Sequence, residues 1–102
     1  MPPFAHSSER AFARLLDEHG LRWEYEPSTF VLRRDEQGRV REAVTPDFYL
    51  PDLDLYVELT AMRPSLAWRK RRKLRLLAER HPDVSVRLVD RHDLAALGVV
   101  TA

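Results

Sequence analysis

The chain has 102 residues, of which 44% are hydrophobic and 32% are charged, and its net charge is +1. These values predict one folded domain, residues 1–102, with a single core. Cysteine is absent, which excludes disulfides and thiolate zinc sites. No apolar run approaches the roughly 18 residues of a membrane span, and the first residues lack the basic and apolar regions of a signal peptide. We therefore expect a cytoplasmic protein that does not enter a membrane.

The charge is distributed unevenly along the sequence. Residues 63–80 carry a net charge of +7, and the remainder of the chain carries −6. Such a cationic stretch is typical of a protein that meets a polyanion along one surface. Its predicted phosphate-binding side chains are Arg63, Arg69, Arg71, Arg72, Lys73 and Arg75.

The first predicted element is a helix that Ser7 or Ser8 caps and that runs to about His19. Glu9 falls on the inward stripe of this helix, one turn from its start. Either this acid simply complements the helix dipole, or it has a functional role. The apolar residues of the stripe are Phe12, Ala13 and Leu16.

Alternating apolar and polar residues predict strands in the middle of the chain. The first covers about 21–26 and the second 29–33, followed by a polar turn at 35–39. The next two form a hairpin of about 44–50 and 55–60.

This hairpin contains the main candidate site. If Leu50 and Leu55 close it, Asp47 lies opposite Glu58, with Cβ atoms roughly 4.5 to 5.5 Å apart. Two carboxylates at this short distance repel each other unless a positive charge lies between them. Mg²⁺ or Mn²⁺ suits such oxygen ligands. Alternatively, Asp47 is only a turn residue after Pro46, and Glu58 is only a solvated strand residue.

Ser65 is predicted to cap a second helix that covers about 66–80. Its inward stripe includes Lys70 and Lys73, which either extend their ammonium groups to water or bring one of them to the carboxylate pair. Trp68 projects from this helix, where it would stack on an unpaired base, pack internally or contact a second copy of the chain.

A strand at about 84–88 and a helical turn capped by Asp90 or Asp93 complete the chain. The expected fold class is α/β of the mixed α+β kind. Its order is a helix, three or four strands, a helix, a strand and a short helix, with the helices flanking one small mixed sheet.

The dipeptide Pro46-Asp47, followed eleven residues later by Glu58-Leu59-Thr60, resembles the motif of the PD-(D/E)XK nuclease superfamily. The likeness extends over roughly residues 8–90 and is greatest to the small members similar to Holliday-junction resolvases and very-short-patch-repair enzymes. It implies a restriction-endonuclease-like core and metal-dependent endonuclease cleavage of DNA, with RNA as an alternative substrate and a homodimer as a possible assembly. The metal, Mg²⁺ or Mn²⁺, would be bound by Asp47, Glu58, the backbone carbonyl of Leu59, and Glu9 from the first helix.

The sequence departs from the family motif at Thr60, where the family has a lysine. Some members take this lysine from the next helix, and Lys70 is our first candidate for it and Lys73 our second. A second hypothesis keeps the fold and the nucleic-acid binding but not the catalysis, with Thr60 marking the loss. In a third hypothesis, the basic helix contacts an acidic protein.

Overall fold

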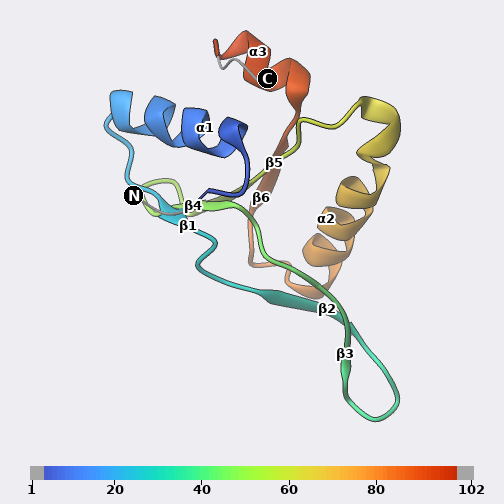
Figure 1. Cartoon of the computed structure of the whole chain (residues 1–102). Coiled ribbons are helices and arrows are strands. Elements are labelled where there is room, and N and C mark those ends of the chain that lie inside the picture. The colour runs from blue at the N-terminus through green and yellow to red at the C-terminus, as the bar shows by residue number, and fades with distance from the viewer. Residues whose placement is uncertain (1–3, 99–102) are drawn as a thin grey trace.

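The structure is a computed structural model that describes residues 4–98 and contains helices and strands in mixed order (Figure 1). The elements are α1 (Ser7–Glu18), β1 (Glu24–Tyr25), β2 (Phe30–Arg34), β3 (Val40–Val44), β4 (Phe48–Leu50), β5 (Leu55–Leu59), a 3₁₀ helix η1 (Pro64–Leu66), α2 (Trp68–Arg80), β6 (Val86–Val89) and α3 (Arg91–Ala96). None of the helices within 4–98 combines the length and the apolar character that crossing a membrane requires.

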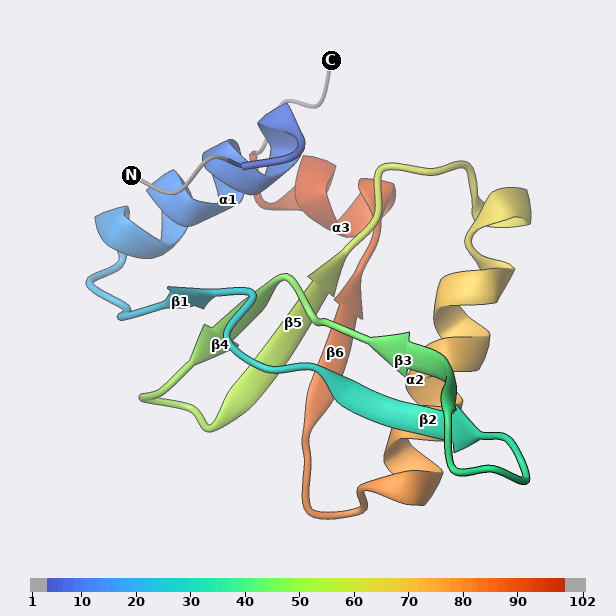
Figure 2. The same ribbon diagram turned by 60° about the horizontal axis from the view of Figure 1, so that its bottom comes forward.

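A mixed four-stranded sheet with the order β1-β4-β5-β6 forms the centre of the fold (Figure 2). β4 and β5 are antiparallel and place Phe48 opposite Val57 and Leu50 opposite Leu55, which confirms the predicted hairpin register. β6 runs parallel to β5. The α+β class and the mixed sheet are therefore as predicted.

One face of this sheet packs against α1 and α3. Phe48 of β4 is fully buried and lies with its ring centroid 5.4 Å from that of Phe12. Leu94 of α3 closes the same core. Replacing such a buried aromatic with alanine typically costs about 3 to 5 kcal/mol. This core fixes α1 beside the start of β4.

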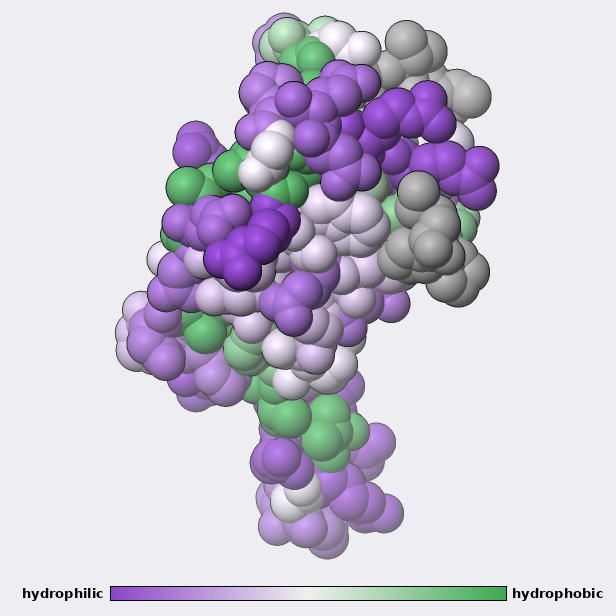
Figure 3. Space-filling view, turned by 90° about the vertical axis from the view of Figure 1, so that its left-hand side faces the viewer, coloured by the Kyte–Doolittle hydropathy of each residue, from purple (hydrophilic) through white to green (hydrophobic). Residues whose placement is uncertain are grey.

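A second, smaller core joins α2 to β2, β3 and β6. Its buried members are Leu32, Val44 and Leu77, with Val86 packed against them. β2 and β3 pair only with each other and form an arm that projects from the body of the molecule, at the bottom of Figure 3. The second core anchors this arm to α2.

The strand predicted at 44–50 is wrong in its first half. Val44 ends β3, and Pro46, which has no N–H to donate to a sheet, separates β3 from β4. As a result, five strands precede α2 within residues 4–98 rather than three or four, and they belong to two sheets rather than one.

Two predicted helix caps are also wrong. His6 occupies the N-cap position of α1 and Ala67 that of α2, and neither side chain makes a capping hydrogen bond. Ser65 lies instead in η1, whose short turn takes up the residues before α2. Of the two residues predicted to cap the last helix, Asp90 and Asp93, Asp90 is the N-cap, since its side chain accepts a hydrogen bond from the backbone N–H of Asp93.

Candidate functional site

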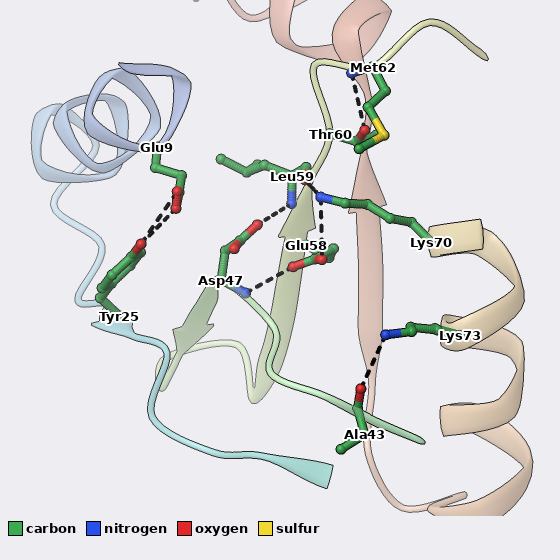
Figure 4. Close-up of polar contacts among 10 residues, drawn as sticks. All are labelled: Glu9, Tyr25, Ala43, Asp47, Glu58, Leu59, Thr60, Met62, Lys70 and Lys73. Carbon is green, nitrogen blue, oxygen red and sulfur yellow. Dashed lines mark hydrogen bonds and ion pairs between the residues drawn. The ribbon is translucent and has the colours of Figure 1, made fainter. Parts of the chain in front are cut away.

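The candidate site lies where β4 begins and β5 ends (Figure 4). The backbone N–H of Asp47 donates a 3.1 Å hydrogen bond to Oε1 of Glu58, and Oδ2 of Asp47 accepts a 2.8 Å bond from the N–H of Leu59. The predicted cross-strand placement of the two acids is therefore observed. Glu58 is 8% exposed, so it is not the solvated strand residue of the alternative interpretation.

Glu9 reaches the same region from the first turn of α1. It is 3% exposed, and its Oε1 accepts a 2.7 Å hydrogen bond from the hydroxyl of Tyr25. Burial and this hydrogen bond raise the pKa of Tyr25, so the phenol remains protonated and continues to donate. Tyr25 therefore fixes the direction of the Glu9 carboxylate, which also benefits from its place at the N-terminal end of the helix dipole.

Glu26 is a site residue that the sequence did not reveal. Its φ angle is +48°, and its N–H donates a 2.9 Å hydrogen bond to the backbone oxygen of Asp47. A glutamate with positive φ directly before a proline is an uncommon, strained conformation. Strand alternation would send Glu26 away from Tyr25, whereas this turn of the backbone brings its carboxylate toward Glu9, which Tyr25 also contacts.

Three carboxylates gather as a result. One oxygen atom each from Glu9, Glu26 and Asp47 lies within 4.8 Å of the others. An all-oxygen donor set suits Mg²⁺ or Mn²⁺. The residues present therefore fit a hard divalent cation, with Glu26 in the group and Glu58 beside it rather than in it.

The surroundings of Asp47 strongly perturb its pKa. Burial, followed by the nearby charge of Glu58, raises its pKa to about 7, although the Leu59 N–H and Lys70 oppose the shift. A carboxyl group that ionises only near neutral pH is a frequent property of functional sites. A bound cation would favour the ionised form.

Lys70 brings a positive charge from α2 to the end of β5. Its ammonium nitrogen donates a 2.7 Å hydrogen bond to the backbone oxygen of Leu59 and lies 3.5 Å from Oε2 of Glu58. Lys73 points elsewhere, with its nitrogen 3.4 Å from the backbone oxygen of Ala43. Of the two candidate lysines, Lys70 is the one that reaches the carboxylates.

Thr60 has a structural place in this arrangement. It is 2% exposed, and its hydroxyl oxygen accepts a 3.2 Å hydrogen bond from the N–H of Met62. Its own N–H donates to the backbone oxygen of Val89. The Thr60 side chain thus stabilises the turn that leaves β5.

An open cleft of about 460 Å³ connects these groups. The first turn of α1 forms one wall, and the segment after β5 forms the other. The groups of chemical interest along it are Glu9, Glu26, Asp47, Leu59, Thr60 and Lys70. The chain matches no known family model, no curated protein and no solved structure.

The predicted phosphate-binding residues have different surroundings. Arg72 forms two hydrogen bonds, of 2.7 and 3.1 Å, with the carboxylate of Glu42 on the arm. Arg33 also contacts Glu42, at 3.3 Å. The carbon at the centre of the Arg69 guanidinium lies 5.4 Å from the centre of the Trp68 ring. The side chains of Arg63, Arg71 and Arg75 are exposed.

Proposed function

We propose that this chain is a metal-dependent nuclease that hydrolyses phosphodiester bonds in DNA, built on the restriction-endonuclease-like core of the PD-(D/E)XK superfamily. The observation that carries the proposal is the convergence of three carboxylates and the Lys70 ammonium on one cleft at the end of β5. Carboxylates that hold a divalent cation, with a lysine close by, are a suitable arrangement for cleaving a phosphodiester.

The acids in this proposal hold the metal. Asp47, Glu9 and Glu26 would bind Mg²⁺ or Mn²⁺, and Glu58 would hold Asp47 and Lys70 in position through its two oxygen atoms. When bound, the cation lowers the pKa of a water molecule and neutralises charge on the phosphate. Tyr25 keeps Glu9 aimed at the cleft.

Lys70 takes the place that the motif lysine has in the family. Its ammonium group is held by the Leu59 carbonyl and by Glu58, which keeps a positive charge at the cleft wall next to the acids. A fixed cation there would stabilise the negative charge that develops on the phosphate during hydrolysis. Because position 60 holds a threonine, the positive charge would be supplied by Lys70 of α2 instead.

The basic residues near α2 would hold the sugar-phosphate backbone of DNA. Arg63, Arg69, Arg71 and Arg75 are exposed on or next to this helix, and contacts of this kind bind without reading sequence. Their affinity should fall steeply as salt rises, because binding releases counterions from the polyanion.

The test is cleavage of labelled linear duplex, nicked, single-stranded and four-way-junction DNA, and of matched RNA, with Mg²⁺ or Mn²⁺. The unaltered chain should cut at least one substrate, the metal should be required, and Asp47→Ala should abolish the activity. Asp83→Ala is the matched control, because Asp83 is an exposed acid that does not line the cleft. If nothing is cut but DNA is bound in a salt-sensitive manner, the fold serves as a binding module instead.

A further inference from the structure

The segment 62–69, which leads from β5 into α2, exposes an unusual concentration of apolar side chains. Within residues 4–98, six large hydrophobic residues are exposed, and three of them are Met62, Leu66 and Trp68, at 47%, 58% and 53%. Scattered exposed apolar residues are normal, but a local group of them marks an interaction surface. Trp68 is too exposed to be explained by internal packing.

Cations are interleaved with these apolar residues. Arg63 lies between Met62 and Leu66 in sequence, and Arg69 follows Trp68 with its guanidinium 5.4 Å from the ring centre. That distance is within the range of a cation–π contact. An exposed aromatic ring with adjacent arginines is the composition of surfaces on which unpaired bases stack while the cations hold the backbone.

The segment also adjoins the cleft. Met62 lines the cleft together with Lys70. Trp68 precedes Lys70 by two residues, so it lies about 3 Å away along the axis of α2 and about 200° around it, on nearly the opposite side of a helix that is roughly 10 Å across. A nucleic acid that leaves the cleft therefore reaches the indole by passing Met62 and the start of α2, around the helix from Lys70.

The charges favour nucleic acid over a second copy of this chain. In a two-fold symmetric dimer the same patch meets itself, which would bring Arg63 and Arg69 of both copies together without a carboxylate in the segment to compensate them. A polyanion instead complements both arginines, and its bases cover the apolar side chains.

We propose that the 62–69 segment binds unpaired bases of a single-stranded nucleic acid beside the cleft, with Trp68 as the stacking residue. The inference rests on the proposed nuclease function and narrows its substrate class to nucleic acids that have an unpaired stretch next to the cleavage point. Fully paired duplex, in which both faces of each base are already stacked, would not use this surface.

The test compares two probes of equal length and charge, oligothymidylate and an abasic oligodeoxynucleotide, in EDTA so that no cleavage occurs. Oligothymidylate should bind more tightly to the unaltered chain. Trp68→Ala should weaken its binding on the order of 10-fold and leave the affinity for the abasic probe unchanged, while Trp68→Phe retains most of the affinity. Leu53→Ala, which truncates an equally exposed apolar residue at 57% exposure on the β4–β5 turn, is the matched control.

Equal binding of the two probes by the unaltered chain would overturn the inference, as would an equal loss on both probes in Trp68→Ala. A dimer in sedimentation that Trp68→Ala disrupts would also overturn it, because the segment would then be a contact between copies. The nuclease proposal is judged separately, by adding Mn²⁺. Base-dependent binding without any cleavage would sustain the inference and reject the nuclease.

Discussion

The ammonium nitrogen of Lys70 lies 2.7 Å from the backbone oxygen of Leu59. This contact joins the first turn of α2 to the end of β5 and sets a positive charge beside Glu58. A helix that packs elsewhere on the sheet would leave the buried Glu58 carboxylate without this cation.

Lys70→Met should abolish most of the proposed cleavage activity. Removing one fixed hydrogen-bond donor that stabilises the charge of the transition state typically lowers the rate about 10²- to 10³-fold. Lys73→Met is the control, because its ammonium contacts Ala43 outside the cleft, and it should change the rate only a few-fold. Single-turnover cleavage measures both, and thermal melting verifies that each variant is folded. Equal losses in the two variants would contradict the assignment of Lys70.

Mn²⁺ should stabilise the folded chain through the three carboxylates. A metal at 100 times its dissociation constant adds about 2.7 kcal/mol to the free energy of unfolding, and melting with and without Mn²⁺ detects this. Glu26→Gln should diminish the metal-induced increase, because its carboxylate belongs to the group with Glu9 and Asp47. Glu24→Gln changes an exposed acid two residues away and should keep the full increase. If both variants respond as the unaltered chain does, Glu26 is not a ligand.

The stability of the metal-free chain should decrease as the pH rises from about 4 to about 7. Asp47 has a pKa of about 7 in the folded chain, against about 3.9 when unfolded, so between these values the folded state binds the extra proton. The loss should be a few kcal/mol and should level off above pH 7. Urea unfolding at a series of pH values measures it, and Asp47→Asn should flatten the curve between these limits. Mn²⁺ should stabilise most above pH 7, because a proposed metal ligand such as Asp47 must be ionised to bind.

Glu42→Gln should increase the affinity for DNA. Glu42 holds both Arg72 and Arg33, and removing its charge leaves two guanidinium groups available for phosphates. Each additional phosphate contact steepens the salt dependence of DNA binding by about one unit.

Arg75→Ala should weaken binding to all sequences alike, whereas Arg72→Ala should weaken it less, because Glu42 already neutralises Arg72. Binding titrations over a range of salt concentrations test these predictions. If Arg72→Ala lost more DNA affinity than Arg75→Ala, the neutralisation of Arg72 by Glu42 would be refuted.

The hairpin was predictable because the residues that determine its register are close together in the sequence. Leu50 and Leu55 flank a turn, and strand alternation then determines that Asp47 lies opposite Glu58. The inward position of Glu9 followed from helix periodicity for the same reason. Both predictions depend on spacings within a single element or hairpin, where geometry is nearly fixed.

Other features depend on contacts that no local pattern contains. The periodicity of α2 placed Lys70 and Lys73 on one stripe, but only the packing of the helix on the sheet determines that Lys70 reaches Glu58. Glu26 joins the site because the backbone adopts a positive φ there, which alternation does not foresee. Pro46 ended a strand inside a stretch that appeared continuous, and β3 was missed as a result.

The parallel pairing of β6 with β5 has a consequence for a chain during its synthesis. β5 completes its hydrogen bonds only when residues 86–89 arrive, since Thr60 and Tyr56 donate to Val89 and Ser85. Until the ribosome has released this strand, one edge of β5 is unpaired, and Glu58 and Leu59 lie on a strand that β6 does not yet support. Emergence of β6 would therefore set the moment at which the sheet that positions Asp47 and Glu58 is complete, and a chain that stops before residue 86 would lack the strand that pairs with this edge of β5.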